Sequence, residues 1–390
     1  MRLRNVLLVL SCVVGLVGCA STRVAGVLPD AVWQDEAFQY TPSQVTETRE
    51  TVFALNDSLM QSLRLDNSLG RPVDQRLDLL VQRLYGPKGI RLSYTSGHTT
   101  GAVETWKNQR GDCLSLTILV YSAARFLNIP AHMQEVRVPV AVDRHDGVDF
   151  INGHVNVFVR NYEGVVISGQ NYGPGALVID FEPEAGARRS GVWLTEDDIL
   201  ARFYNNRATE YLVQKDDARA YAYFRAAIDK APDFAPVYAN LAQLYMRRGL
   251  FIGAEQLLTH AIALGGTSYA PLRGMHQLLV AQGRTTEARY YVDLMAKRQD
   301  EDPYHWLGLG MTALRDGQYG SAIRVLERAA ALTTGFEEIH YHLGLAYWRD
   351  GQREAARKQL AALSAINHLD PGVATLSKKF SALAPESTVY

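Results

Sequence analysis

The sequence has almost no net charge and, after its first residues, no long apolar run. Its 40 basic and 41 acidic residues give a formal net charge of -1, which argues against a global field that recruits nucleic acid or an anionic membrane surface. Without a second apolar run, a transmembrane domain is not expected. Hydrophobic content of 47% and charged content of 21% are typical of a folded soluble protein.

Motifs of cofactor and metal chemistry are also missing. The sequence has no glycine-rich phosphate loop and no Gly-x-Ser-x-Gly elbow. Histidines such as His98, His132 and His145 do not stand at the paired spacing with cysteine or carboxylate that a structural metal site needs. We therefore predict no metal, no cofactor and no nucleic-acid partner.

Of the three cysteines, two lie at the N-terminus. Arg2 and Arg4 precede an apolar stretch from Val6 to Val17, the pattern of a cleaved signal peptide. The stretch ends in Leu16-Val17-Gly18-Cys19, which resembles the lipobox of bacterial lipoproteins. The resemblance implies that residues 1–19 are a lipoprotein signal, that Cys19 is lipidated and that residues 20–42 are a tether.

The residue after Cys19 refines this prediction. Ala20, rather than an aspartate, resembles the form sent to the outer membrane of Gram-negative cells, so we expect a lipid anchor at its periplasmic face. With Cys12 removed and Cys19 lipidated, Cys113 is the only thiol of the mature chain. An intramolecular disulfide is then impossible, and Cys113 is either a small core residue or a nucleophile.

From about residue 201 the sequence repeats every 34 residues. Columns of equivalent residues keep this spacing: Ala220, Ala254, Ala288, Ala322 and Ala356; Phe224, Leu258, Val292, Leu326 and Leu360; Gly249, Gly283, Gly317 and Gly351; and Leu241, Met275, Leu309 and Leu343. Such a period predicts stacked units of two short helices, each of which buries its apolar face against its neighbours.

This register resembles the tetratricopeptide repeat. Trp306–Gly310 and His342–Tyr347 look like first helices, and Ser321–Leu326 looks like a second helix. The resemblance implies an all-α solenoid over residues 201–370, with about five helix pairs, followed by a C-terminal tail at 371–390. It also implies a concave groove for a protein or peptide partner, for which the polar and aromatic residues outside the apolar columns are candidates: Tyr238, Gln243, Arg273, Gln277, His305 and His340.

Residues 43–200 have a mixed pattern, in which Ser43–Leu65 and Pro72–Leu84 are expected to be helical. The informative run is Arg110-Gly111-Asp112-Cys113, followed at once by an apolar helical pattern. That order places Cys113 at a helix N-terminus, where the dipole and the unpaired N–H groups should lower the pKa of the thiol. Strands are expected at 133–138, 153–159 and 176–183, the last two carrying His154 and Asp180.

The Arg-Gly-Asp-Cys helix start, the Gly153-His154 strand and the Ile179-Asp180 strand resemble the transglutaminase-like superfamily of the papain-like fold. The resemblance implies an α+β domain in which Cys113 is the nucleophile, His154 the general base and acid, and Asp180 the residue that orients the imidazole. The stretch from His154 to Asp180 is long for this family, which implies an insertion around residues 172–175, and Asn171 is an alternative third member.

Two functions follow. One is a cysteine hydrolase or acyltransferase that acts on an amide or isopeptide of a protein or peptide, with the repeats recruiting a partner. The other is a lipid-anchored scaffold in which the repeats carry the function and the site is not enzymatic.

Overall fold

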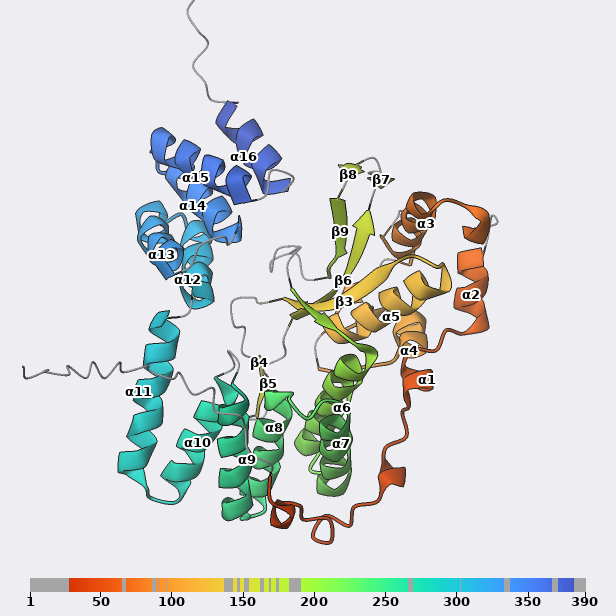
Figure 1. The fold of residues 1–390 in the computed structure, drawn as a ribbon, viewed down its shortest axis with the longest axis vertical. Coiled ribbons are helices and arrows are strands. Elements are labelled where there is room, and N and C mark those ends of the chain that lie inside the picture. Colours follow the sequence, from red (N-terminus) through yellow and green to blue (C-terminus); the bar gives the residue numbers. More distant parts are fainter. Residues whose placement is uncertain are drawn as a thin grey trace, which may run out of the picture.

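The computed structural model describes residues 28–381 except 65–67, 86–88, 91, 96, 137–142, 146–147, 151–153, 162–164, 168–169, 173–174, 182–190, 266–268, 302, 333–336 and 367–370. A unit of helices and a sheet is followed by an array of antiparallel helices, as Figure 1 shows. The expected signal peptide, Cys19 and the first part of the tether lie outside the described residues.

The described part of the expected tether, from residue 28, packs against the helical array. It contains the 3-10 helices η1 (Asp30–Val32) and η2 (Pro42–Gln44). Val32 and Phe38 are buried, and the Phe38 ring stacks on Tyr221 and Tyr245 at centroid distances of 4.5 and 5.6 Å. The expectation of a free tether over 20–42 is therefore wrong for residues 28–42, because apolar and aromatic side chains there are buried by the array. We call residues 28–47 the strap.

The expected helix over Ser43–Leu65 is divided. The structure has α1 (Arg49–Val52) and α2 (Asp57–Arg64), because Thr48 and Asn56 each cap a new helix: their side-chain oxygens accept from Thr51 N at 3.4 Å and Leu59 N at 2.8 Å. A short 3-10 helix η3 (Ser68–Gly70) leads to α3 (Val73–Tyr85), close to the expected Pro72–Leu84, and α4 spans Ala102–Asn108.

An antiparallel sheet covers the central helix of this unit. Helix α5 (Cys113–Phe126) packs against β3 (Ala131–Val136) and β6 (His154–Asn161). The strand order is β10-β3-β6-β9, with β9 at Gly175–Ile179 and β10 at Val192–Leu194. Helices α2, α3 and α4 contact the other sides of α5 (Figure 1). Three strands were expected from the sequence, and the fourth, β10, was not.

Short strand pairs complete this unit. β4 (Asp143–His145) pairs with β5 (Val148–Phe150), and β7 (Val165–Ile167) pairs with β8 (Gln170–Tyr172). β1 (Ser93–Tyr94) and β2 (Arg110–Gly111) form a parallel bridge before α5. Since β6 and β9 are neighbours in the sheet, the β7–β8 hairpin accounts for the extra length between His154 and Asp180.

The C-terminal helices follow one another in antiparallel pairs. Their bounds are α6 (Glu196–Val213), α7 (Asp217–Lys230), α8 (Ala235–Arg247), α9 (Phe251–Leu264), α10 (Ala270–Ala281), α11 (Thr285–Glu301), α12 (Pro303–Arg315), α13 (Tyr319–Leu332), α14 (Glu337–Arg349), α15 (Arg353–Ile366) and α16 (Pro371–Ser381). The first helix begins before residue 201, at a capping box of Thr195 and Asp198. Residues 371–381, expected in a tail, form α16, which packs on α14 and α15.

The repeat columns have clear structural reasons. All five alanines of the first column are buried where the two helices of a pair meet. The four glycines between the helices of later pairs have φ between 72° and 83°, the left-handed region that favours glycine. In the first pair the same turn position is Lys215, whose φ is 63°.

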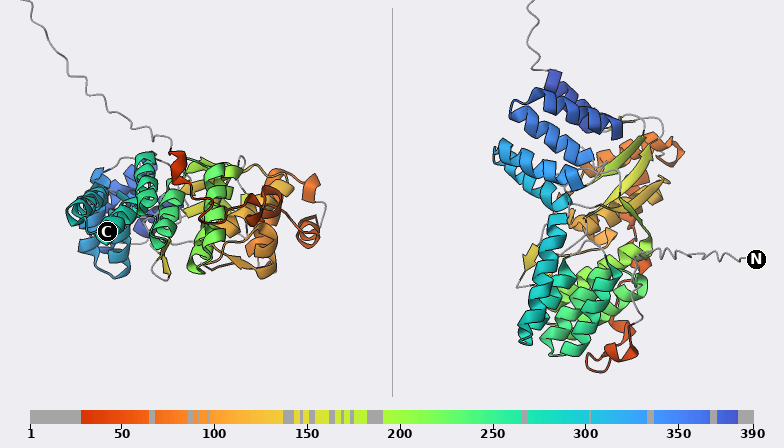
Figure 2. Two further views of the ribbon diagram at one scale, coloured as in Figure 1. Left: turned by 90° about the horizontal axis from the view of Figure 1, so that it is seen from below. Right: turned by 60° about the vertical axis from the view of Figure 1, so that its left-hand side comes forward.

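The array is interrupted between α11 and α12. Val292 and Leu309 stand in apolar columns, yet both are 43% exposed, whereas Leu258, Met275 and Leu343 in the same columns are buried. Residues after this point form a second core cluster, from Leu307 to Ala356. The right view of Figure 2 shows α12–α16 continuing as a separate stack beyond the end of α11.

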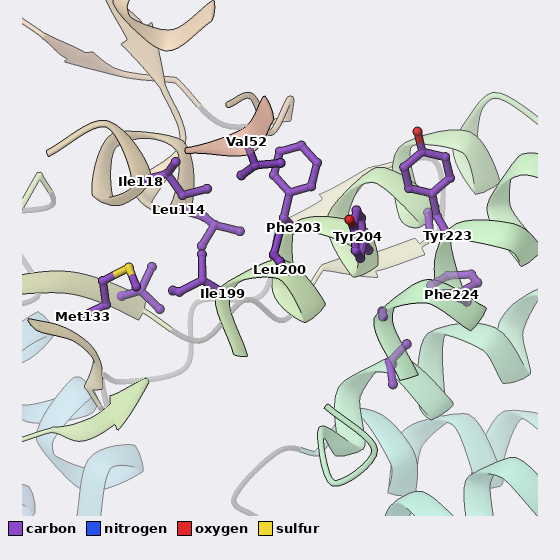
Figure 3. Close-up of a cluster of buried hydrophobic side chains, with 14 of the residues drawn as sticks. Val52, Leu114, Ile118, Met133, Ile199, Leu200, Phe203, Tyr204, Tyr223 and Phe224 are labelled. Carbon is purple, nitrogen blue, oxygen red and sulfur yellow. The ribbon is translucent and has the colours of Figure 1, made fainter. Parts of the chain in front are cut away.

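The sheet unit and the first repeats share one core. A single cluster of buried residues runs from Val32 in the strap, through α5 and the sheet, to Ala288 in α11. Figure 3 shows its middle, where Leu114 and Ile118 of α5 lie beside Ile199, Leu200 and Phe203 of α6. The sheet unit and the first repeats therefore do not have separate cores. No helix in the described part of the chain is long and apolar enough to cross a membrane.

Candidate functional site

Cys113 is the first residue of α5, as the sequence predicts. Asp112 caps the helix: its Oδ1 accepts from Ser115 N at 2.7 Å and from Ser115 Oγ at 2.6 Å. Gly111 is required because a Cβ there would stand only 2.7 Å from the Cβ of Ser115. The Gly111-Asp112-Cys113 segment is therefore closely packed where it leads into α5, and it places the thiol at the N-terminus of this helix.

The loop before α4 connects this segment to α6, the first helix of the array. Thr99 Oγ1 donates to Asp112 Oδ2. The same threonine is held from α6, because Asn206 Nδ2 donates to Thr99 Oγ1 at 3.1 Å and Thr99 N donates to Glu210 Oε1 at 2.8 Å. Thr99 and Asp112 are both buried, and burial raises the pKa of the Asp112 carboxyl, against the hydrogen bonds from Ser115 and Thr99 that lower it. Helix α6 is therefore linked through Thr99 to Asp112, which caps the Cys113 helix.

His154 and Asp180 meet at the edge of the sheet. Nε2 of His154 lies 2.8 Å from both Oδ1 and Oδ2 of Asp180, and the two side chains are only 2% and 4% exposed. His154 is the first residue of β6 and Asp180 follows the end of β9, so the β6–β9 pairing brings them together. With Nε2 turned to Asp180, Nδ1 is the ring nitrogen left for the thiol.

Cys113 lies beside this pair because α5 is fastened to β6. Thr117 Oγ1, one turn after the thiol, donates to the carbonyl oxygen of Val155 at 3.1 Å. Burial raises the pKa of the Cys113 thiol; a hydrogen bond to His154 lowers it, and the charge of Asp112 raises it. The sequence predicts a lowered pKa from the helix start, and this is wrong because burial outweighs the helix terminus. With its pKa raised, the thiol needs a base to take its proton before the sulfur can act as a nucleophile, and His154 is the neighbouring base.

Asp180, rather than Asn171, is the residue that lies beside His154. Asn171, the alternative third member, pairs through its backbone with Val166 in the β7–β8 hairpin, whereas Asp180 occupies the position beside His154 Nε2. Cys19 lies outside the described residues. In the described part of the chain no group of three or more His, Cys, Asp or Glu side chains could hold a metal ion.

The helical array matches a known repeat. Residues 313–379 fit the family model for the tetratricopeptide repeat, and the helix pairs before them continue the same 34-residue columns. The array is therefore an all-α solenoid of tetratricopeptide-like helix pairs.

Known proteins resemble parts of the chain. The BBSome complex member BBS4 of Bos taurus is 26% identical over 157 residues, which are 40% of this chain and 30% of the bovine protein. The match thus spans less than a third of that relative. Among solved structures, YrrB, a TPR protein with an unusual peptide-binding site, is 20% identical, with 47% of this chain and 94% of YrrB covered and a TM-score of 0.24. PilF of Pseudomonas aeruginosa is 17% identical, with 50% and 96% covered and a TM-score of 0.25.

Not every expected groove residue lies on an open face of the repeats. Tyr238 is only 3% exposed and its hydroxyl donates to the carbonyl oxygen of Pro232, so its assignment as a groove residue is wrong: the phenol fills the core. Gln243 and Gln277 hold equivalent positions in consecutive first helices, and Gln243 Nε2 donates to Gln277 Oε1 at 3.4 Å. Gln277 is exposed. Arg273, His305 and His340 are partly exposed.

Sequence reasoning missed the buried polar groups around the site. Thr99, Gln134 and Asn156 are all buried and hydrogen bonded near Asp112 or Asp180. A signal existed for Asn156, because it stands two residues after His154 in a strand and so shares its face.

Proposed function

We propose that the chain is an adaptor whose tetratricopeptide repeats bind a protein or peptide partner, and that a lipid on Cys19 holds it at the periplasmic face of the outer membrane. The observation that carries the binding function is the pair Gln243 and Gln277, which places hydrogen-bonding side chains in line on consecutive first helices. Side-chain amides in such a line can bind the backbone of an extended peptide, and this class of repeat commonly binds peptides or proteins.

A photo-crosslinker placed at single positions of the full chain tests this proposal. We expect a discrete adduct with a partner when the crosslinker replaces Gln277, on a first helix. Thr259 is the matched control, because it is exposed but lies on the second helix α9. Equal adducts at both positions, or an adduct only at 259, would show that the first-helix face does not select the partner.

The anchor has its own test. Cys19→Ala should prevent incorporation of labelled palmitate and release the protein from the membrane fraction. A Cys19→Ala protein that still sediments with membranes would remove the anchor from the proposal.

A second candidate function is cysteine chemistry on an amide, supported by the thiol at the start of α5 beside a histidine that Asp180 orients. In such a reaction His154 takes the thiol proton as sulfur attacks the carbonyl carbon, and returns it to the leaving amine as the thioester forms. Water or a second amine then attacks the thioester and restores the thiol. The substrate supplies the acyl group and the leaving amine, and the acceptor takes the acyl group from the thioester.

Alkylation of the full chain by iodoacetamide, followed on the Cys113 peptide by mass spectrometry, tests this second function. Because burial raises the pKa of the thiol, we expect the rate to rise with a midpoint above that of a free thiol, and to fall when His154 is replaced by Ala. A Cys113 that reacts only after denaturation would be a core residue, and the adaptor function would stand alone.

A further inference from the structure

Two buried amides extend the polar network of the cysteine site across the sheet. Asn156 Nδ2 donates to Asp180 Oδ2 at 3.0 Å, and Gln134 Nε2 donates to Asn156 Oδ1 at 2.9 Å. Both side chains are fully buried. We propose that Asn156 is a positioning residue that fixes Asp180, and through it the tautomer of His154, while Gln134 holds Asn156. This inference rests on the second candidate function.

The strand register explains why these residues meet. β3 and β6 are antiparallel with Gln134 opposite Asn156. β6 and β9 are antiparallel with Val157 opposite Ile179, so the same register continued by one residue sets Asp180 opposite Asn156. Side chains directly opposite each other on adjacent strands lie about 4.5–5.5 Å apart at Cβ. Gln134, Asn156 and Asp180 therefore form one row across three strands.

The row restricts how the carboxylate can turn. Both oxygens of Asp180 lie 2.8 Å from His154 Nε2, so these two contacts do not distinguish one oxygen from the other. The amide of Asn156 donates to Oδ2 and so favours one orientation of the carboxylate. A fixed acceptor keeps the proton of the imidazole on Nε2, and the Nδ1 lone pair then faces the thiol proton. The amide acts on Cys113 only through Asp180 and His154.

A purely structural role for the row predicts a different result. Buried amides that only satisfy each other between strands would lower stability when removed, without changing the titration of a thiol on α5. Tyr238 offers a control, since it is a buried residue of α8 whose hydroxyl donates to the carbonyl oxygen of Pro232 at 2.7 Å, away from the row. Asn156→Leu and Tyr238→Phe each remove one buried polar group that donates a hydrogen bond.

The experiment measures the pH profile of Cys113 alkylation in the full chain for wild type, Asn156→Leu, Tyr238→Phe and His154→Ala. Since the hydrogen bond to His154 lowers the thiol pKa, loosening His154 should move the midpoint upward. For Asn156→Leu we expect a shift of about half to one pH unit, which is roughly a three- to tenfold slower reaction below the midpoint. The shift should not exceed that of His154→Ala, and Tyr238→Phe should leave the profile unchanged.

The outcomes separate this inference from the proposed chemistry. A reactive wild-type thiol with unchanged profile in Asn156→Leu overturns the positioning role and leaves the cysteine function intact. If Asn156→Leu does not fold, Gln134→Leu decides in its place, with a smaller shift in the same direction expected. If the native thiol is unreactive, the cysteine function fails, and the tautomer of His154 measured by NMR decides the positioning role: loss of the Nε2-protonated form in Asn156→Leu supports it, and an unchanged tautomer overturns it.

Discussion

The interruption between α11 and α12 predicts different losses of stability for two leucines that occupy the same repeat position. Leu309 in α12 and Leu343 in α14 stand 34 residues apart in one apolar column. Leu343 is 2% exposed and Leu309 is 43% exposed. In a continuous array both would be buried, because the second helix of each pair packs on the first helix of the next. Between α9 and α10 this contact is tight: a Cβ on Gly274 would stand 2.7 Å from Leu258.

The exposures set the expected losses of stability. Leu→Ala removes three carbon groups, each worth about 0.8 kcal/mol when buried, and the cavity left in a closed core raises the total to about 3–5 kcal/mol. We expect that loss for Leu343→Ala. With 43% of Leu309 already in water, the transfer contribution falls to about 1.4 kcal/mol and no closed cavity forms. The two variants should therefore differ by about 1.5–3.5 kcal/mol.

Urea unfolding of the full chain, followed by circular dichroism at the helix band, measures both losses. The two leucines belong to the same stack, α12–α16, so their midpoints can be compared within one transition. Similar losses for Leu309→Ala and Leu343→Ala would mean that Leu309 is packed in solution, and that α12 closes against α11 to form a continuous array.

Three further predictions concern the strap, a turn and a buried phenol. Phe38→Ala should cost about 3–5 kcal/mol in urea unfolding because the ring is buried by the array, and a loss below about 1 kcal/mol would show that the strap detaches. Lys215→Gly should raise the free energy of unfolding by up to about 1 kcal/mol, since φ of 63° favours glycine; a decrease would mean that the lysine side chain stabilises the turn. Burial raises the pKa of Tyr204 from 10.0 to about 12, so the stability linked to its neutral form is complete below pH 10 and is lost as pH rises toward 12. Absorbance at 295 nm in wild type and Tyr204→Phe should place its titration near pH 12, and a midpoint near 10 would contradict the burial.

The repeats could be predicted well because each column has a local cause. The glycine column marks a turn with positive φ, and the alanine column marks the closest approach of two helices, so both follow from the conformation of one unit. Lys215 shows the limit of this reasoning. It takes the same left-handed turn without the glycine that marks it in the later pairs, so the glycine column alone does not reveal the first helix pair.

The positions of Cys113, His154 and Asp180 in the fold could be predicted from the sequence, but the pKa of the thiol could not. Cys113, His154 and Asp180 follow from a helix start and two strands, and the structure brings His154 and Asp180 within 2.8 Å. The pKa of Cys113 depends on how deeply α5 is covered by the sheet and by α6, which is set by distant parts of the chain. A helix terminus read from the sequence carries no information on that burial.

The packing of the strap and the interruption of the array could not be predicted from the sequence, for a related reason. Phe38 and its partners Tyr221 and Tyr245 are more than 180 residues apart. An extended segment has no periodic pattern from which its packing partner could be predicted. Three aromatic residues in a supposed tether, Trp33, Phe38 and Tyr40, were the available signal. At the interruption, Val292 and Leu309 keep the apolar identity of their columns, so identity alone could not show that the helices part there.

Helix α6 connects the sheet unit to the helical array, so removing it would disturb both units. Its apolar face shares the core with α5, while Asn206 and Glu210 hold Thr99, which in turn binds the cap of the Cys113 helix. The strap adds a second connection, because Tyr245 of α8 donates to the carbonyl oxygen of Val32 at 2.8 Å. A truncation after residue 200 would uncover the site, and one at residue 235 would uncover the strap. Loss of thiol reactivity in either fragment would follow from the lost core, so the partner-binding face and the cysteine site have to be separated by point substitutions in the full chain.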